Sequence, residues 1–188
     1  MHVSGNEADG GSLIIQPNFN SDKFNNNLVL SGRGPAANYH HGFMRLVNSA
    51  LNIRRNVKFT GTIELAGDTT VGVSGVCQGS KIAEFSGVVS GVGALTVKGG
   101  GTLKLSNANT YTGGTVIEDG VVEITDASSL GTGDVEICEG ATLRILNPLA
   151  IKLANKIIGK GRIECNGEAV EFENADAFEG AKASRRTR

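Results

Sequence analysis

Hydrophobic and polar residues alternate in short segments that return along the middle of the chain at a nearly constant spacing. Each segment has the pattern small–x–apolar–x–apolar, and the segments begin at residues 61, 81, 101, 120, 141 and 161. Five alternating residues match the period and the length of a β-strand and are too few for a helix. The sequence therefore predicts a β-strand in every repeat of about 20 residues.

A second, looser series of alternating segments precedes three of these strands. It comprises Gly93–Val97, Gly114–Ile117 and Gly133–Ile137. A unit with two short strands cannot bury its own apolar face, but it can do so when successive units stack and equivalent strands pair in parallel. We therefore predict an all-β fold, a right-handed parallel β-helix (a solenoid) with coils of about 20 residues and an irregular N-terminal cap.

Alternation divides the side chains of the first series between two faces of the predicted sheet. The apolar positions form two inward columns: Ile63, Ala83, Leu103, Val122, Leu143, Ile163 and Leu65, Phe85, Leu105, Ile124, Ile145, Cys165. The residue between them faces solvent and is Glu64, Glu84, Lys104, Glu123, Arg144 or Glu164. From Glu84 onward the charges alternate in sign, so stacked neighbours about 4.8 Å apart attract each other. We interpret this column as a ladder that sets the register, with a charged binding stripe as the alternative.

Composition narrows the class of protein. The chain has 188 residues, 27 of them glycine, no tryptophan and a formal net charge of −1. These values exclude a collagen, a heptad array and a membrane span, and the length is that of one domain. A near-neutral chain also gives no general reason to expect binding to a phosphate backbone.

Residues 99–122 read GGGTLKLSNANTYTGGTVIEDGVV and resemble the passenger-associated transport repeat of autotransporters, also called the autotransporter-associated β-helix repeat. The matching positions are Gly99, Gly101, Leu103, Leu105, Asn109, Tyr111, Gly113, Gly114, Thr115 and Gly120. The repeat spacing extends the resemblance over residues 56–166. In the corner of this motif, Gly113-Gly114 allows positive φ, Asn107 and Asn109 can bond their own backbone, and Tyr111 can cover the turn.

The resemblance implies a secreted or cell-surface protein of a Gram-negative-type bacterium, in which the repeat forms the exported stalk. Met1–Gly11 has no signal-peptide pattern. No alternating lipid-facing strands follow Phe178, so we expect no membrane barrel in this chain. The sequence is then expected to be a passenger segment or a small exported protein.

Three regions are predicted along the chain. Residues 1–55 supply N-terminal strands and a capping region, residues 56–175 form the β-helix with the autotransporter-type repeat, and residues 176–188 form a flexible basic tail.

Four acidic residues are the candidates for catalysis. Glu118 and Asp119 lie one coil before Glu139, and paired carboxylates can do general acid and base work. Asp68 begins an Asp-Thr-Thr segment similar to the Asp-Thr-Gly element of aspartic proteases, but Thr70 replaces the glycine and no second Asp-Thr occurs. Turn residues facing water are the alternative for all four acidic residues.

Other chemistry finds little support in the sequence. Cys77, Cys138 and Cys165 are too far apart for a disulfide framework or a CxxC metal site. His40 and His41 would face opposite sides of a strand, and His2 stands alone. We predict no cofactor and no metal.

Three functions follow. The first is a rigid adhesion or interaction scaffold at the cell surface, without enzymatic activity, directed at host glycoproteins, mucus or neighbouring cells. The second is a secreted hydrolase of mucin or another glycoprotein, aspartic-protease-like through Asp68 or glycosidase-like through Glu118, Asp119 and Glu139. The third is a weak nucleic-acid binder that uses Arg54, Arg55 and the stretch Arg185–Arg188. The ligand and the oligomeric state stay open.

Overall fold

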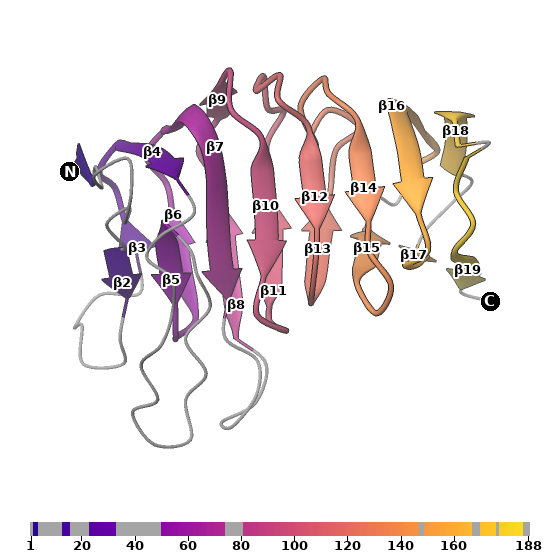
Figure 1. The fold of residues 1–188 in the computed structure, drawn as a ribbon, viewed down its shortest axis with the longest axis horizontal. Helices are drawn as coiled ribbons and strands as arrows, with labels where there is room; N and C mark the ends of the chain where they lie inside the picture. The colour runs from indigo at the N-terminus through magenta and orange to yellow at the C-terminus, as the bar shows by residue number, and fades with distance from the viewer. Residues whose placement is uncertain are drawn as a thin grey trace.

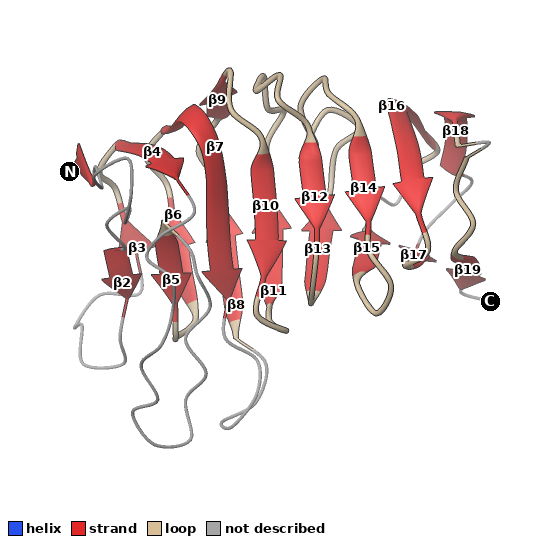
Figure 2. Ribbon diagram, in the orientation of Figure 1, coloured by secondary structure: helices blue, strands red, loops and turns tan. Residues whose placement is uncertain are grey.

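Two parallel β-sheets run side by side along the whole described chain. The computed structural model describes residues 2–3, 13–15, 23–32, 50–73, 81–146, 149–166, 170–175 and 177–185. Within these residues every regular element is a strand (Figure 2). All strand pairs among them are parallel. The predicted all-β parallel solenoid is therefore confirmed, while its handedness stays a prediction.

The first sheet, called here the β10 sheet, has 11 described strands and contains the second sequence series. Its members are β1 (His2–Val3), β2 (Leu13–Ile15), β4 (Leu28–Gly32), β5 (Leu51–Ile53), β7 (Ile63–Val73), β9 (Val89–Gly91), β10 (Leu95–Lys98), β12 (Thr115–Ile117), β14 (Val135–Ile137), β16 (Ile151–Gly159) and β18 (Val170–Asn174). Successive coils add one strand after another, from β7 to β18 (Figure 1).

The second sheet, called here the β11 sheet, has 8 described strands and contains most of the first series. Its members are β3 (Lys23–Phe24), β6 (Val57–Phe59), β8 (Ile82–Phe85), β11 (Thr102–Leu105), β13 (Val121–Ile124), β15 (Thr142–Ile145), β17 (Arg162–Asn166) and β19 (Ala181–Arg185). They stack in the order of the chain, from β3 at one end to β19 at the other. Stacking like this buries the apolar face that no single coil could bury.

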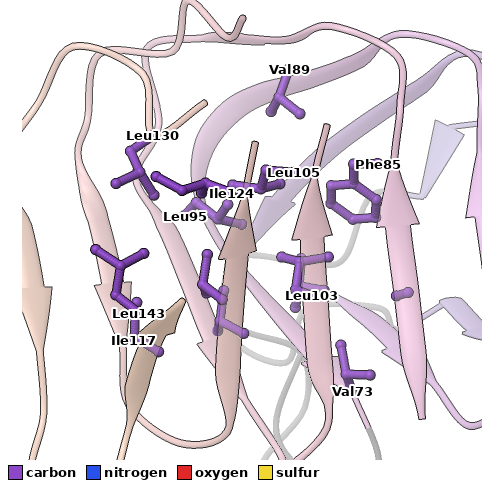
Figure 3. Close-up of a cluster of buried hydrophobic side chains, with 14 of the residues drawn as sticks. Val73, Phe85, Val89, Leu95, Leu103, Leu105, Ile117, Ile124, Leu130 and Leu143 are labelled. Atoms are coloured by element: carbon purple, nitrogen blue, oxygen red, sulfur yellow. The ribbon is translucent and has the colours of Figure 1, made fainter. Parts of the chain in front are cut away.

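Strand alternation fills the space between the sheets. The inward side chains of both sheets form one continuous hydrophobic cluster. Leu95 and Ile117 of the β10 sheet lie in it with Leu103, Leu105 and Ile124 of the β11 sheet (Figure 3). Because the coils follow one another along the axis, every coil contributes to the same core.

The first predicted strand belongs to the other sheet. Ile63 and Leu65 lie in β7 and pair with Val89 and Gly91, whereas Val57 and Phe59 of β6 pair with Ala83 and Phe85. The prediction for residues 61–65 is therefore wrong in its placement, although Ile63 and Leu65 are fully buried. The physical reason is the 11-residue strand β7, which lengthens this coil and puts Lys58 and Glu84 26 residues apart.

The described residues near both ends of the chain form strands that pair with the rest of the solenoid. Strands β3, β4 and β5, in the region interpreted as a cap, pair directly with β6 and β7. Residues 181–185, assigned to a flexible tail, instead form β19, which pairs with β17. An unpaired strand edge offers backbone donors and acceptors to any segment that can reach it, and this adds a strand even without an apolar pattern.

Candidate functional site

The corner between β11 and β12 contains the residues of the sequence motif. Asn109 is only 3% exposed. Its side-chain Oδ1 accepts a hydrogen bond from the Val89 backbone N–H at 2.8 Å, and its Nδ2 donates to the Ser129 carbonyl at 2.6 Å. These partners lie one coil before and one coil after Asn109, so a single amide ties three coils together. The sequence suggested that Asn109 bonds its own turn, and that interpretation is wrong.

Tyr111 fills the inside of the same corner. The ring is fully buried, and its hydroxyl lies 2.6 Å from Thr115 Oγ1. Thr115 in turn donates to the Leu130 carbonyl at 3.3 Å. Burial raises the pKa of Tyr111 well above its usual range, although the hydrogen bond with Thr115 opposes this shift. The phenol therefore stays protonated, and its role here is to hold adjacent coils.

Gly113 and Gly114 are needed for different reasons. A Cβ on Gly113 would lie 2.3 Å from the Ala94 backbone nitrogen of the preceding coil, so any side chain would push the two coils apart. Gly114 has φ +90, a conformation that glycine adopts without strain. The predicted positive φ is confirmed at Gly114 and is absent at Gly113.

A later coil has its own buried amide. Asn155 in β16 is 6% exposed, and its Nδ2 donates to the carbonyls of Gly131 and Gly133 at 3.1 and 2.8 Å. Asn155 carries no signal in the sequence, because no Asn-x-Tyr-x-Gly-Gly pattern surrounds it. Only its place between alternating residues of a strand could have indicated an inward amide.

The outward column of the β11 sheet alternates in charge from β6 to β17. Its members, defined here as the charged column, are Lys58, Glu84, Lys104, Glu123, Arg144 and Glu164. Glu64 was expected as the first member of this column. Lys58 stands there instead, because β8 pairs with β6 and not with β7. Lys58 Nζ lies 2.9 Å from Glu84 Oε1, and Arg144 Nε lies 3.0 Å from Glu164 Oε2. Lys104 and Arg144 each lie 3.7 Å from an oxygen of Glu123.

Glu84 of the charged column accepts hydrogen bonds from two side chains, Lys58 and Ser106. Partial burial acts to raise its pKa, but hydrogen bonds from Lys58 and Ser106 and the charges of Lys58 and Lys104 outweigh burial and lower the pKa overall. Each half-exposed pair contributes about 0.2–1 kcal/mol. Each member of the charged column therefore has an oppositely charged neighbour within the column. This pairing favours a ladder that sets the register over a charged binding stripe.

The proposed glycosidase carboxylates lie on adjacent turns and face water. Glu118 Oε2 lies 2.6 Å from Lys98 Nζ, and Asp119 Oδ1 accepts a hydrogen bond from the Gly120 backbone at 2.8 Å. The backbone places Glu139 one coil further on, since the neighbouring Cys138 N–H donates to the Ile117 carbonyl. All three carboxylates are exposed. The geometry gives Glu118 and Asp119 structural partners, and the hydrolase stays a hypothesis.

Asp68 lies on an exposed part of β7. Its Oδ1 accepts a hydrogen bond from the Ala94 backbone N–H at 3.0 Å, and so it joins two coils. Thr69 beside it donates to the Gly67 carbonyl at 2.8 Å. The Asp-Thr-Thr segment is therefore extended strand in the described structure, with a backbone partner for the carboxylate.

Three of the basic residues proposed for nucleic-acid binding, Arg54, Arg55 and Arg185, are described, and they lie on distant elements. Arg54 and Arg55 lie between β5 and β6, close to one end of the sheets, and Arg185 ends β19 at the opposite end (Figure 1). Residues 186–188 lie outside the described residues. The backbone of Arg185 is therefore separated from Arg54 and Arg55 by the rungs between β6 and β19.

The cysteines and histidines give no second centre in the described part. Burial raises the pKa of the Cys138 thiol, with Glu136 and Glu118 adding to the shift, and burial likewise raises the pKa of Cys165. His40, His41 and Cys77 lie outside the described residues, and only the backbone of His2 is described. Across the ranges that are described, no three His, Cys, Asp or Glu side chains gather as metal ligands. The described residues also contain no helix that is long and apolar enough to cross a membrane.

A comparison with protein families decides what the Asn109 corner is. The family model described as the passenger-associated transport repeat matches residues 95–124, from β10 to the end of β13. The chain carries an autotransporter passenger repeat. The buried amide, the buried phenol and the two glycines of the corner all lie inside the matched segment, so the repeat's polar and glycine positions serve coil stacking.

A curated relative agrees with this assignment. The chain is 32% identical over 92 residues to the protein named Adhesin BmaC autotransporter from Brucella suis biovar 1 (strain 1330). The match covers 43% of this chain and 3% of that protein, so it spans a small fraction of the relative's length. No solved structure matches the chain.

Proposed function

We propose that this chain is a segment of a surface-exposed or secreted adhesin passenger, whose solenoid presents its outer faces to host glycoproteins or mucus. The observation that carries the proposal is the passenger repeat at residues 95–124, in which the side chains of Asn109 and Tyr111 form hydrogen bonds inside the coil. A relative named as an adhesin supports the same role.

The outer faces favour polar contacts. Every described aromatic side chain is buried or half-buried. The large apolar residues that are exposed, Ile82, Val92 and Leu149, lie on separate elements. A target would therefore meet hydroxyl, amide and charged groups on two long, flat surfaces, and such contacts gain strength from repetition along the solenoid.

The two faces can be tested with a matched pair of substitutions. Val116 in β12 and Val121 in β13 are half-buried valines on the outward sides of the two different sheets. Arginine at either position adds the same bulk and charge to one face only. Binding of the labelled chain would be measured on surfaces coated with mucin, with deglycosylated mucin and with albumin.

The proposal predicts saturable binding to mucin over albumin. It also predicts that at least one of Val116→Arg and Val121→Arg weakens binding at least tenfold, about 1.4 kcal/mol. Circular dichroism would show that both variants keep their strands. Equal binding to mucin and albumin, or unchanged binding by both folded variants, would contradict the proposal.

A further inference from the structure

The turn between β12 and β13 holds a carboxyl group against the backbone of the residue that follows it. Asp119 is exposed, and its Oδ1 accepts a hydrogen bond from the Gly120 N–H at 2.8 Å. An oxygen bonded to Asp119 Cγ therefore touches the next peptide nitrogen. Among the described backbone hydrogen bonds, none uses this N–H, so the strand ladder does not hold it. Two groups that are kept this close approach the geometry from which they react.

The residue after Asp119 leaves its nitrogen open to the carboxyl group. Gly120 has φ +82, and a Cβ there would lie 2.5 Å from the Gly101 carbonyl oxygen, so the turn requires glycine. The absence of a Cβ also removes the atom that would crowd the peptide nitrogen. The other described aspartates, Asp68, Asp126 and Asp134, are followed by threonine, alanine and valine.

Both sides of the Asp119–Gly120 peptide bond are fixed to neighbouring coils. The Asp119 N–H donates to the Val97 carbonyl of the preceding coil at 3.4 Å, and the Gly120 carbonyl accepts from the Thr142 N–H of the following coil at 2.9 Å. These bonds keep the carboxyl group and the nitrogen together in the folded chain. They also leave little room for a longer main chain between them.

We propose that Asp119–Gly120 is a site of spontaneous backbone isomerisation in the folded chain. The Gly120 nitrogen attacks Cγ of the protonated carboxyl group, so that the N–Cγ bond forms, the bond from Cγ to its hydroxyl breaks, and water leaves with the proton of the nitrogen. The product is a five-membered succinimide ring. Water then adds to the former main-chain carbonyl carbon of residue 119, its bond to the nitrogen breaks, and the nitrogen regains a proton.

The product is an isoaspartate, in which the main chain passes through Cβ and Cγ of residue 119. Its mass equals that of the starting chain, because the water lost in the first step returns in the second. The main chain gains one atom between the contacts to Val97 and Thr142, inside the segment 95–124 that matches the passenger repeat. Isomerisation should therefore loosen the corner between β12 and β13 and lower the urea concentration at which the chain unfolds.

The test is to store the folded chain at mildly acidic pH and to locate isoaspartate by peptide mapping with fragmentation that distinguishes the two isomers. Asp126 is the matched control within the chain, since it is also exposed but its Oδ1 accepts from the Ser128 N–H, two residues on, at 2.8 Å. We expect isoaspartate to accumulate roughly tenfold faster at residue 119 than at residue 126. Equal rates at the two residues, or isoaspartate at residue 119 only after unfolding in urea, would show that the proposal is wrong.

Two variants test the chemistry of the attack. Asp119→Glu keeps the charge, but the same attack would have to close a six-membered ring, so we expect no rearranged product at residue 119. Asp119→Asn keeps an oxygen for the Gly120 N–H and releases ammonia in place of water, so we expect faster rearrangement, with a rate that rises with pH. Circular dichroism would show that both variants keep their strands. A rate for Asp119→Asn no higher than that of the unchanged chain would contradict attack by the Gly120 nitrogen.

Discussion

The rungs from β8 to β17 and the rungs from β3 to β7 share the same stacking but differ in how their corners are held. In the first group, Asn109 links residues that lie 20 positions away on either side. In the second group, Asn27 accepts a hydrogen bond from the Thr62 backbone 35 positions away, and Asn56 accepts one from Ile82, 26 positions away. Asparagine thus bonds the neighbouring coil in both groups, across corners of different length.

Burial separates the two groups. Asn109 and Tyr111 lie inside a short corner, whereas Asn56 lies on an exposed turn. An aromatic column joins the second group to the first: Phe24 stacks on Phe59 at 5.3 Å, and Phe59 meets Phe85 of β8 edge to face at 5.3 Å. The short coil thus buries polar groups in its corner, whereas the longer coils have an exposed Asn56 turn and bury Asn52, Thr69 and Thr70 within strands β5 and β7.

The largest expected effect is the loss of the buried phenol. Tyr111→Ala removes a fully buried ring and leaves a cavity, so we expect the free energy of unfolding to fall by about 3–5 kcal/mol. Phe24→Ala removes a half-buried ring at the end of its column and should cost less than half as much. Urea unfolding measures both changes. Equal losses would mean that the two groups of rungs do not differ as described.

The asparagines give a closer comparison of the two corners. Asn109→Ala leaves the Val89 N–H and the Ser129 carbonyl without their partner inside the core, and we expect a loss of about 2–4 kcal/mol from the two orphaned groups. Asn56→Ala exposes the Ile82 N–H to water and should cost about 0.5–1 kcal/mol. A loss at Asn56 as large as that at Asn109 would contradict the role given to burial.

A smaller effect is expected in acid. The pKa of Glu84 is lowered in the folded chain, so its contribution to stability is complete above its unfolded pKa of about 4.5 and is lost as the pH falls through the lower folded value. Glu84→Gln should therefore destabilise the chain by less than about 1 kcal/mol at neutral pH and flatten the loss of stability below pH 4.5. Urea unfolding from pH 2 to 7 measures this difference. If Glu84→Gln left the free energy of unfolding unchanged at every pH, Glu84 would not stabilise the charged column.

The smallest effects are expected at the proposed hydrolase residues. Asp68→Asn keeps an oxygen that can accept the Ala94 N–H, and Glu139→Gln alters an exposed turn, so both should change stability by less than about 0.5 kcal/mol. The scaffold interpretation predicts no mucin or peptide turnover that depends on either residue, from acidic to neutral pH. Turnover by the unchanged chain that disappears in one variant would favour the hydrolase.

The sequence predicted the regular rungs well because their spacing and alternation coincide. Ala83, Leu103, Val122, Leu143 and Ile163 stand in one inward column as expected. Ile63 was placed one sheet away from its position, because a pattern of alternation does not reveal that β7 continues for 11 residues. The repeat spacing of about 20 residues therefore predicted the strand before β8 at residues 61–65, whereas the strand that pairs with β8 is Val57–Phe59.

The corner and the last rung were less predictable for a different reason. The motif drew attention to Asn109 and Tyr111, but their partners at Val89, Ser129 and Leu130 follow from the stacking of coils and not from local sequence. Lys182 was assigned to a basic tail because a charged residue at an inward position breaks the pattern from which inward positions are predicted.

Contacts between methyl groups of neighbouring coils test the central claim most directly. In methyl-labelled protein, nuclear Overhauser effects should join Leu103 with Val122 and Val122 with Leu143, because each pair is in register on adjacent strands. Leu103 and Leu143 lie two rungs apart, about 9.6 Å, and should show at most a weak effect. A stacked solenoid predicts this stepwise pattern. Strong contacts between Leu103 and Leu143, or none between Leu103 and Val122, would contradict it.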